Sequence, residues 1–266
     1  MLSNEDIEAA IDQLEKAERS RVQTGLISIR HPKATIDDAY AIQVAWVTRK
    51  LVAGHKSIGW KIGLTSKAMQ NALNITTPDS GVLFDDMLFA DGSAIPQTRF
   101  IQPRIEAEIA FVMKADLKGP NVTAAQVLAA TDYVVPSLEI LDTRILRVDP
   151  VTKKARNIVD TISDNAANAG IVLGTQKHKP QDIDLRWVGA IVFKNDEVEE
   201  TGLGAGVLND PTLGIAWLAN RLHHYGDSIS AGQIVLSGSF IRPLETKHGD
   251  LIHADFGAFG SVSCRF

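Results

Sequence analysis

Hydrophobic residues near the start of the chain follow a helical period. Between residues 7 and 14 they recur three or four positions apart, and Ser3 with Asp6 forms a capping-box pattern in front of them. We therefore predict a helix over residues 4 to about 20.

A second apolar stripe follows Thr35 and Asp38, which offer another N-terminal cap, and it ends at Gly54. The pattern assigns to this stripe Tyr40, Val44, Val47 and Leu51. Two helices in succession predict a helical N-terminal segment over residues 1–55.

Beyond Gly54 the pattern changes to short aliphatic or β-branched runs broken by Gly, Pro and Asp, as in "GVLFDDMLFADGSAIP". Two helices interrupt these strands: one begins after Thr123, with Gln126 completing a capping box, and one begins at Pro211 and runs to about Leu222. Many strands with scattered helices predict an α+β fold and argue against a parallel βαβ array. Residues 56–266 are expected to form one catalytic domain.

Gly-rich "TGLGAGVLND" does not change this picture. Its third glycine falls at the wrong offset for a dinucleotide-binding loop, so we interpret it as a turn or a close backbone approach.

Composition narrows the classes of partner. The chain has 266 residues, 45% of them hydrophobic, and a net charge of -5, so it presents no strongly basic face for nucleic acid or a membrane surface. It has one cysteine, Cys264, no apolar run long enough for a transmembrane helix, and an acidic N-terminus unlike a signal peptide. These features favour a cytoplasmic protein.

Two glutamates, Glu106 and Glu108, lie one residue apart in the apolar run "RIEAEIAF". Because strand side chains alternate between faces, both point the same way, and like charges at that separation favour a bound cation or a shared proton. The alternative is a solvated strand face.

Glu139 adds a third acid within the apolar run "DYVVPSLEILDTR". Three carboxylates are the hard oxygen ligands that suit Mg²⁺ or Mn²⁺, and three ligands leave coordination positions open for a substrate. The histidines form no zinc-binding pattern, and no nucleophile elbow is present.

Lys61, between Gly59 and Gly63, is a candidate for proton transfer, with a surface lysine on an edge strand as the alternative. Asp79 in "TTPDSG" is either a second acid–base residue or a turn residue. "DTISDNAANAG", which contains Ser163, is either a helix cap or a binding loop.

Taken as an ordered set, "GWKIGLTSKAM", "PRIEAEIAF", "DYVVPSLEILDTR" and "DTISDNAANAG" resemble the hydratases of aromatic meta-cleavage pathways, within the fumarylacetoacetate hydrolase superfamily. The resemblance covers nearly the whole chain. It implies a mixed-sheet β-roll and a homo-oligomer, a pentamer or a decamer.

The resemblance also implies a metal-dependent hydratase. Mg²⁺, with Mn²⁺ as a possible substitute, is expected on Glu106, Glu108 and Glu139, with Lys61 and Asp79 handling protons beside it. The implied substrate is a small 2-oxo or 2-hydroxydienoic dicarboxylic acid. Ser163 is a candidate substrate-binding residue.

Sister enzymes of the same superfamily keep other reactions open. Oxalocrotonate-type decarboxylases, pentenoate hydratases and C–C hydrolases act on chelating 2-oxo acids, so the metal ligands cannot separate them. A catalytically silent ligand-binding protein is the alternative of a different class.

Basic residues in or beside "RVDPVTKKAR" (147–156) are candidates for binding a second carboxylate of the substrate. The resemblance marks this segment as typical of the members that act on longer dicarboxylates. The candidates are Arg144, Lys153, Lys154 and Arg156. The alternative is a solvated basic loop.

Overall fold

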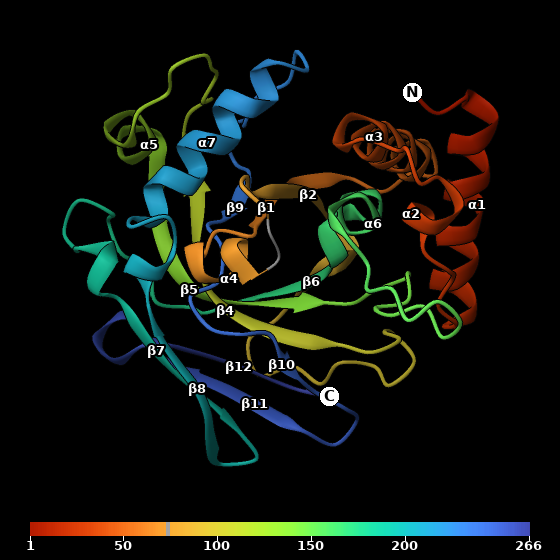
Figure 1. The fold of residues 1–266 in the computed structure, drawn as a ribbon. Coiled ribbons are helices and arrows are strands. Elements are labelled where there is room, and N and C mark those ends of the chain that lie inside the picture. Colours follow the sequence, from red (N-terminus) through yellow and green to blue (C-terminus); the bar gives the residue numbers. More distant parts are fainter. Residues whose placement is uncertain (73–74) are drawn as a thin grey trace.

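Two β-sheets pack against each other, and the helices gather on the side of the larger sheet (Figure 1). The computed structural model describes residues 1–72 and 75–266. The larger sheet has the strand order β2-β1-β9-β4-β5-β6-β3, with β10 paired to β4, and the smaller sheet has the order β12-β11-β7-β8. The strands of the larger sheet are β1 (Ser57–Gly63), β2 (Asp79–Phe84), β3 (Leu88–Phe89), β4 (Arg104–Met113), β5 (Thr131–Leu141), β6 (Asn168–Leu173), β9 (Ile234–Leu236) and β10 (Leu244–Glu245). Those of the smaller sheet are β7 (Gly189–Lys194), β8 (Glu197–Leu203), β11 (Leu251–Asp255) and β12 (Ser261–Arg265).

Strand pairing is mixed, and antiparallel pairs predominate. Only β1–β9 and β3–β6 are parallel among the strand pairs of the described residues, and neither parallel pair is part of an alternating βαβ array. The predicted α+β class with a mixed sheet is therefore confirmed.

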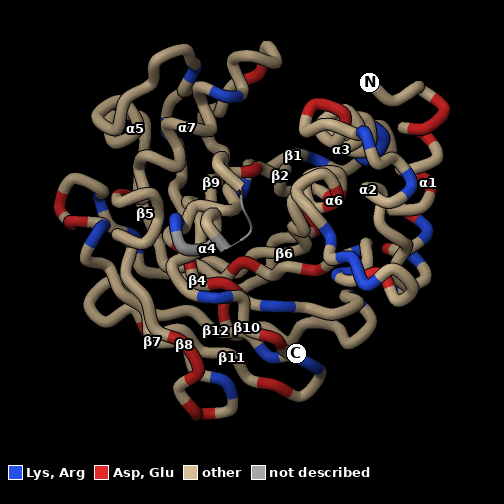
Figure 2. Tube along the Cα trace, in the orientation of Figure 1, with Lys and Arg blue, Asp and Glu red and all other residues tan. Residues whose placement is uncertain are grey.

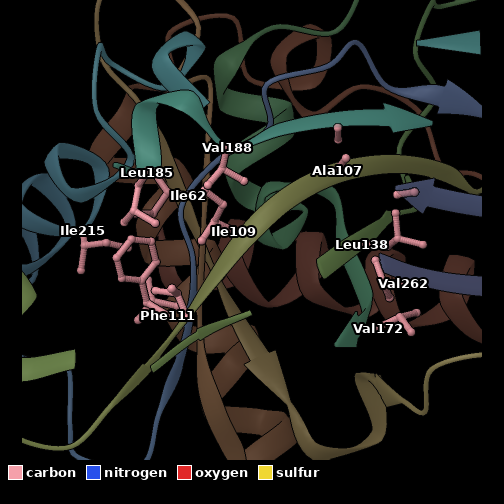
Figure 3. Packing of buried hydrophobic residues seen from close by; sticks show 14 of the residues in the cluster. Ile62, Ala107, Ile109, Phe111, Leu138, Val172, Leu185, Val188, Ile215 and Val262 are labelled. Carbon is pink, nitrogen blue, oxygen red and sulfur yellow. The ribbon is translucent and has the colours of Figure 1, made fainter. Parts of the chain in front are cut away.

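Strand β4 separates the hydrophobic core from the candidate site. Its odd-numbered residues, from Ile105 to Phe111, are fully buried and pack against the smaller sheet and α7 (Figure 3). Its even-numbered residues, which include Glu106 and Glu108, point to the opposite face. The alternation expected from the sequence is therefore present along the whole strand.

Helices form where caps predict them. The α-helices are α1 (Asn4–Ser20), α2 (Ile27–Arg30), α3 (Ile36–Val52), α4 (Lys67–Ala72), α5 (Ala124–Ala130), α6 (Ile158–Ser163) and α7 (Pro211–His223). The predicted capping boxes at Ser3, Thr35 and Thr123 are all formed, and Asp210 caps α7, which starts at Pro211. Each cap satisfies backbone N–H groups that have no partner inside the helix.

The predicted apolar stripe of α3 is half right: Tyr40 is buried and Val47 packs against the cluster of Val82, Phe84 and Met87, but Val44 and Leu51 are exposed. Val44 and Leu51 are 56% and 42% exposed, whereas Ile42 and Trp46 are buried. Helix α3 packs against both α1 and α6, which rotates the buried face away from the expected one. That face also contains Gln43. Its buried amide is satisfied because it donates to the carbonyls of Ser80 and Ile162.

The N-terminal helices have a core of their own, to which Ile145, Val159 and Ile162 contribute from a later part of the chain. Charged residues of both signs lie along α1 and α3 (Figure 2), and Arg49 and Lys50 of α3 pair with Glu8 and Glu18 of α1. The division into residues 1–55 and 56–266 stays a prediction. Within the described residues, none of the helices combines the length and the apolar character that crossing a membrane requires.

Gly202, in the Gly-rich segment, lies against another backbone. A Cβ atom at this position would be 1.9 Å from the carbonyl oxygen of Phe240. The segment is therefore a close backbone approach at the end of β8, as one of the two sequence interpretations predicted.

Candidate metal centre and active site

Three glutamates meet where β4 and β5 pair. Glu106 lies directly opposite Glu139 in the antiparallel register, and Glu108 lies two residues further along the same face of β4. One carboxylate oxygen from each glutamate lies within 4.8 Å of the oxygens from the other two. Glu108 and Glu139 are fully buried and Glu106 is half-buried. The alternative of a solvated strand face is therefore wrong.

The carboxylate oxygens are poorly satisfied by the protein. Glu108 Oε2 accepts a hydrogen bond of 2.7 Å from the backbone N–H of Gly238. Glu108 Oε1 and both Oε atoms of Glu139 are buried and accept no hydrogen bond from the described residues. A buried charge without partners is strongly unfavourable, and hard oxygen donors in this arrangement match the preference of Mg²⁺ and Mn²⁺. The residues present therefore fit a divalent cation.

The pKa values of the three glutamates also show that the protein stabilises their charged forms poorly. Burial, followed by repulsion from Glu139, raises the pKa of Glu106 to about 8. Burial likewise raises the pKa of Glu108 well above its usual value and raises the pKa of Glu139. Without a cation the cluster therefore holds protons near neutral pH, and a cation would displace them.

Lys61 extends into the glutamate cluster from β1, which lies between β2 and β9 and is not an edge strand. Its side chain is 3% exposed, and its Nζ lies 3.3 Å from Glu139 Oε1 and donates to the carbonyl of Ala166 at 3.2 Å. Burial acts to lower the pKa of Lys61, but attraction to Glu139 and Asp79 outweighs burial, so the pKa is raised. The expected alternative, a surface lysine on an edge strand, is wrong.

Asp79 is the first residue of β2 and pairs with Gly63 of β1, so it is a strand residue and not a turn residue. It is 1% exposed, and its Oδ1 accepts no hydrogen bond from the described residues. Burial raises its pKa, although attraction to Lys61 opposes this.

Gly63 explains how Asp79 and Lys61 come together. A Cβ atom on Gly63 would lie 2.2 Å from Asp79 Oδ1 and 3.0 Å from Lys61 Nζ. Both candidate acid–base groups therefore lie over one backbone position that has room only for glycine.

The "SDNAANAG" segment both ends a helix and borders the site. Asn157 caps α6, and Asn165–Ala167 follow it with positive φ angles of 51° to 58°. Asn165 is held by paired hydrogen bonds to the backbone of Val82, and this tight turn directs the carbonyl of Ala166 towards Lys61. Ser163 is buried at the end of α6, and its Oγ makes no hydrogen bond within the described chain. Its role in substrate binding stays a prediction.

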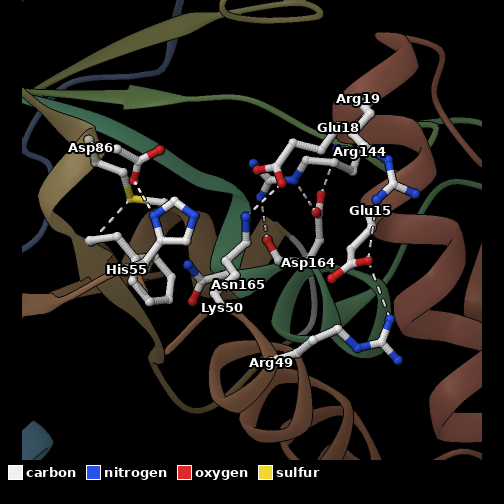
Figure 4. Close-up of polar contacts among 12 residues, drawn as sticks. Glu15, Glu18, Arg19, Arg49, Lys50, His55, Asp86, Arg144, Asp164 and Asn165 are labelled. Carbon is white, nitrogen blue, oxygen red and sulfur yellow. Dashed lines mark hydrogen bonds and ion pairs between the residues drawn. The ribbon is translucent and has the colours of Figure 1, made fainter. Parts of the chain in front are cut away.

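Arg144 and Arg156 have different environments. Arg144 is buried, and each nitrogen of its guanidinium donates to Asp164 or to the carbonyl of Asn168 (Figure 4). Arg156 is half-buried, and its Nη1 makes no hydrogen bond within the described chain. The contacts favour Arg156 over Arg144 as a substrate ligand.

Sequence reasoning missed two features near the site. Gly238 supplies a backbone N–H to Glu108, and no local pattern indicates that contact. Arg104 lies two residues before Glu106, so strand alternation could have placed it on the same face.

A second group of potential ligands, His55 with Asp85 and Asp86, also meets in space. This group is exposed or half-buried, and Asp86 already pairs with Arg99 at 2.7 Å. It lacks the buried, unpaired oxygens of the glutamate cluster.

A distant solved structure shares the fold. A solved structure from Yersinia pestis CO92, described as a fumarylacetoacetate hydrolase family protein, superposes with a TM-score of 0.55 at 14% identity and covers 78% of this chain and 91% of that chain. This chain therefore has the fold of that superfamily. No protein-family model matches it.

Two further comparisons identify the family. The 2-oxo-hept-4-ene-1,7-dioate hydratase of Escherichia coli is 53% identical over 254 residues, which cover 96% of this chain and 95% of that protein. The solved 4-oxalocrotonate decarboxylase from Pseudomonas putida G7, complexed with magnesium and adipate, superposes with a TM-score of 0.93 at 34% identity and covers 100% and 99% of the two chains. This chain belongs to the family of hydratases and decarboxylases within the fumarylacetoacetate hydrolase superfamily, and the resemblance drawn from its motifs is confirmed.

Proposed function

We propose that this protein is a divalent-metal-dependent hydro-lyase that adds water to 2-oxohept-4-ene-1,7-dioate, formed from its 2-hydroxydienoate tautomer. The product is 4-hydroxy-2-oxoheptane-1,7-dioate, an intermediate of homoprotocatechuate and 4-hydroxyphenylacetate catabolism. The observation that carries the choice of reaction is the 53% identity to the E. coli hydratase, against 34% to the decarboxylase.

We assign the metal to Glu106, Glu108 and Glu139, because one carboxylate oxygen from each converges within 4.8 Å and oxygens of Glu108 and Glu139 accept no hydrogen bond from the described residues. Mg²⁺ is the proposed ion, and Mn²⁺ accepts the same ligands. When bound, the cation stabilises negative charge on the oxygen atoms of a 2-oxo acid.

Lys61 and Asp79 divide the proton transfers. Lys61 is held cationic by the surrounding carboxylates and can donate a proton but not accept one. It loses part of that attraction when the glutamates are neutralised, so its ammonium becomes a better donor to oxygen. Asp79, whose pKa is raised by burial, can both take and return a proton, which suits the exchange with carbon and with water.

The reaction balances as one water added across one double bond. Asp79 takes the proton of the 2-hydroxyl group of the dienoate and returns it to C5, which leaves a 2-oxo group conjugated to the C3–C4 double bond, the conjugated isomer of the 4-ene. The oxygen of water then bonds to C4 as Asp79 accepts a proton from it, and Asp79 returns that proton to C3.

Absorbance of 2-hydroxyhepta-2,4-dienedioate tests the proposal. With Mg²⁺ the ultraviolet band should disappear and 4-hydroxy-2-oxoheptane-1,7-dioate should form, and chelation should stop both. No loss of absorbance with the metal present would reject the proposal.

A decarboxylase is the second candidate, because the superposition on 4-oxalocrotonate decarboxylase covers the whole chain. Release of CO₂ from 4-oxalocrotonate, without hydration of the dienedioate, would favour it. A 2-oxopent-4-enoate hydratase is the remaining alternative and would prefer the shorter monocarboxylate.

We also infer a cytoplasmic homo-oligomer, a pentamer or decamer. Exposed hydrophobic side chains on and beside β7 and β8 support an interface: Trp187 is 74% exposed, Val198 56% and Leu203 44%. Sedimentation equilibrium tests this inference, and a monomer would contradict it. The cytoplasmic location rests on the single cysteine, Cys264, which cannot form an internal disulfide.

A further inference from the structure

Three arginines lie together at one border of the candidate site. Arg104 starts β4, while Arg147 and Arg156 come from the two ends of the loop that follows β5. In that loop Val148 and Ala155 form an antiparallel bridge, and Arg156 N–H donates to the carbonyl of Arg147 at 2.9 Å. The hairpin therefore places Arg147 and Arg156 side by side.

Arg104 ties this cluster to the metal ligands. It shares the face of β4 with Glu106, two residues away, which is about 6.5 Å along a strand. Its positive charge acts on Glu106, and the charge of Arg156 acts on Asp79. The cluster thus lies beside the proposed catalytic groups.

Each of the three guanidinium groups has a nitrogen that makes no hydrogen bond within the described residues. Glu245 pairs with Arg104 and lies 3.4 Å from Arg147, and its side chain is 72% exposed. Arg104 Nε, Arg147 Nε and Arg156 Nη1 are buried and donate to no acceptor among the described residues. Buried donors without acceptors are unfavourable, and a carboxylate is the acceptor that matches guanidinium geometry.

The net charge of the arginine cluster also favours an anionic ligand. Burial, followed by repulsion from Arg104 and Arg156, lowers the pKa of Arg147 to about 10. Burial also lowers the pKa of Arg156. One exposed carboxylate, Glu245, therefore leaves an excess of positive charge that an anionic ligand would neutralise.

The other basic candidates do not fit. Arg144 is fully engaged by Asp164 and Asn168, and Lys153 and Lys154 are exposed at the tip of the hairpin.

We propose that Arg104, Arg147 and Arg156 bind the distal carboxylate of the substrate and so make this enzyme specific for 2-oxo dicarboxylates over 2-oxo monocarboxylates. The inference rests on the proposed function, because it assigns a place to the second carboxylate of the same substrate. It adds a specificity site of three residues, of which Arg104 and Arg147 emerge only from the structure.

A matched pair of unreactive ligands tests the proposal. 2-Oxoheptanedioate and 2-oxoheptanoate share the chelating end and the chain length and differ only in the distal carboxylate. Calorimetry with Mg²⁺ present should show that the native protein prefers the dioate by about 10- to 100-fold, the range expected for charge-assisted hydrogen bonds. Arg156→Ala and Arg147→Ala should each lose about 10-fold or more in dioate affinity and change monoacid affinity by less than about 3-fold.

Lys154→Ala is the control, because it removes a positive charge from the same hairpin at an exposed position. It should leave the preference for the dioate unchanged. Equal weakening of both ligands by Arg156→Ala, or equal affinity of the native protein for the two ligands, would overturn the proposal.

Arg156→Lys keeps the charge but loses the planar fork, so it should recover part of the dioate affinity. Folding of each variant is checked by unchanged Mg²⁺ affinity.

The binding test also separates this proposal from the proposed function. Binding that prefers the dioate and depends on the arginines, without hydration of the dienedioate, would reject the hydratase and keep the specificity site. Hydration of 2-hydroxypenta-2,4-dienoate as efficient as that of the dienedioate would keep the hydratase and reject the specificity site.

Discussion

Two groups of buried charges in this protein differ in how well the protein satisfies them. Arg144 and Asp164 form an ion pair with Nε to Oδ1 at 2.5 Å, and further hydrogen bonds engage each guanidinium nitrogen (Figure 4). Glu108 and Glu139 are as deeply buried, yet Glu108 Oε1 and both Oε atoms of Glu139 accept no hydrogen bond from the described residues, and Lys61 Nζ lies 3.3 Å from Glu139 Oε1 as a counter-charge.

The difference separates a structural pair from a binding site. A satisfied pair fixes one arrangement of the chain and requires no ligand. Unpaired carboxylates are unfavourable in the folded protein and become favourable only when something binds them. Partner satisfaction is therefore a better guide to function here than burial.

Loss of one ligand should have the largest effect on the binding site. Glu106→Gln replaces a half-buried carboxylate with a neutral amide of the same shape, so Mg²⁺ affinity should fall by more than about 100-fold and hydration should fall to background. Calorimetric titration and the absorbance assay measure the two effects. Unchanged metal affinity in this variant would show that Glu106 is not a ligand.

Loss of one partner should break the structural pair. Arg144→Ala leaves Asp164 buried without its counter-ion, so the free energy of unfolding should fall by about 3–5 kcal/mol. Denaturant unfolding measures the loss, and the Mg²⁺ affinity of the folded variant should not change.

Asp12→Asn is the surface control, because Asp12 is an exposed partner of Arg49 at 2.7 Å. Its free energy of unfolding should change by less than about 1 kcal/mol. A larger loss from Asp12→Asn than from Arg144→Ala would reverse the comparison.

A methyl group on Gly63 should damage catalysis without removing a ligand. Gly63→Ala pushes Asp79 and Lys61 away from their shared position, so kcat should fall by about 100-fold while Mg²⁺ affinity stays within a few-fold. Gly25→Ala, where a Cβ meets nothing within 4 Å, is the control and should keep full activity. Retention of kcat in Gly63→Ala would remove Asp79 and Lys61 from the chemistry.

A change of pH should have the smallest effect, and stability and Mg²⁺ affinity should change gradually with it. The pKa of Glu106 is about 8 in the folded protein without metal, against an ordinary value of 4.5, so the folded state binds more protons than the unfolded state between these values. The metal-free protein should therefore gain stability from this group as pH falls from about 8, while Mg²⁺ affinity decreases as protons compete. Calorimetry in buffers of different ionisation enthalpy should detect protons released on binding near neutral pH, and no release would contradict the raised pKa.

Local features were predictable from the sequence. Helix caps depend on residues three positions apart, so Ser3, Thr35, Thr123 and Asp210 identified their helices. Alternation along a strand depends on neighbouring residues, so Glu106 and Glu108 could be placed on one face.

Features that depend on contacts between distant segments were harder to predict from the sequence. The buried face of α3 depends on its contacts with α1 and α6, and the local pattern placed Val44 and Leu51 on it wrongly. The central position of Lys61 depends on the pairing of β1 with β2 and β9, and the arginine cluster depends on the course of a loop. The spacing of residues within one segment does not indicate which other segments will pack against it.

The register of β4 against β5 has a consequence for folding. A shift of one residue would turn Ile105, Ala107 and Ile109 into the site and turn Glu106 and Glu108 into the core against the smaller sheet. The same alignment thus secures the hydrophobic core and brings the proposed metal ligands together. Chains that pair these strands wrongly cannot capture the ion, so the amount of tightly held metal after refolding counts the correctly aligned molecules.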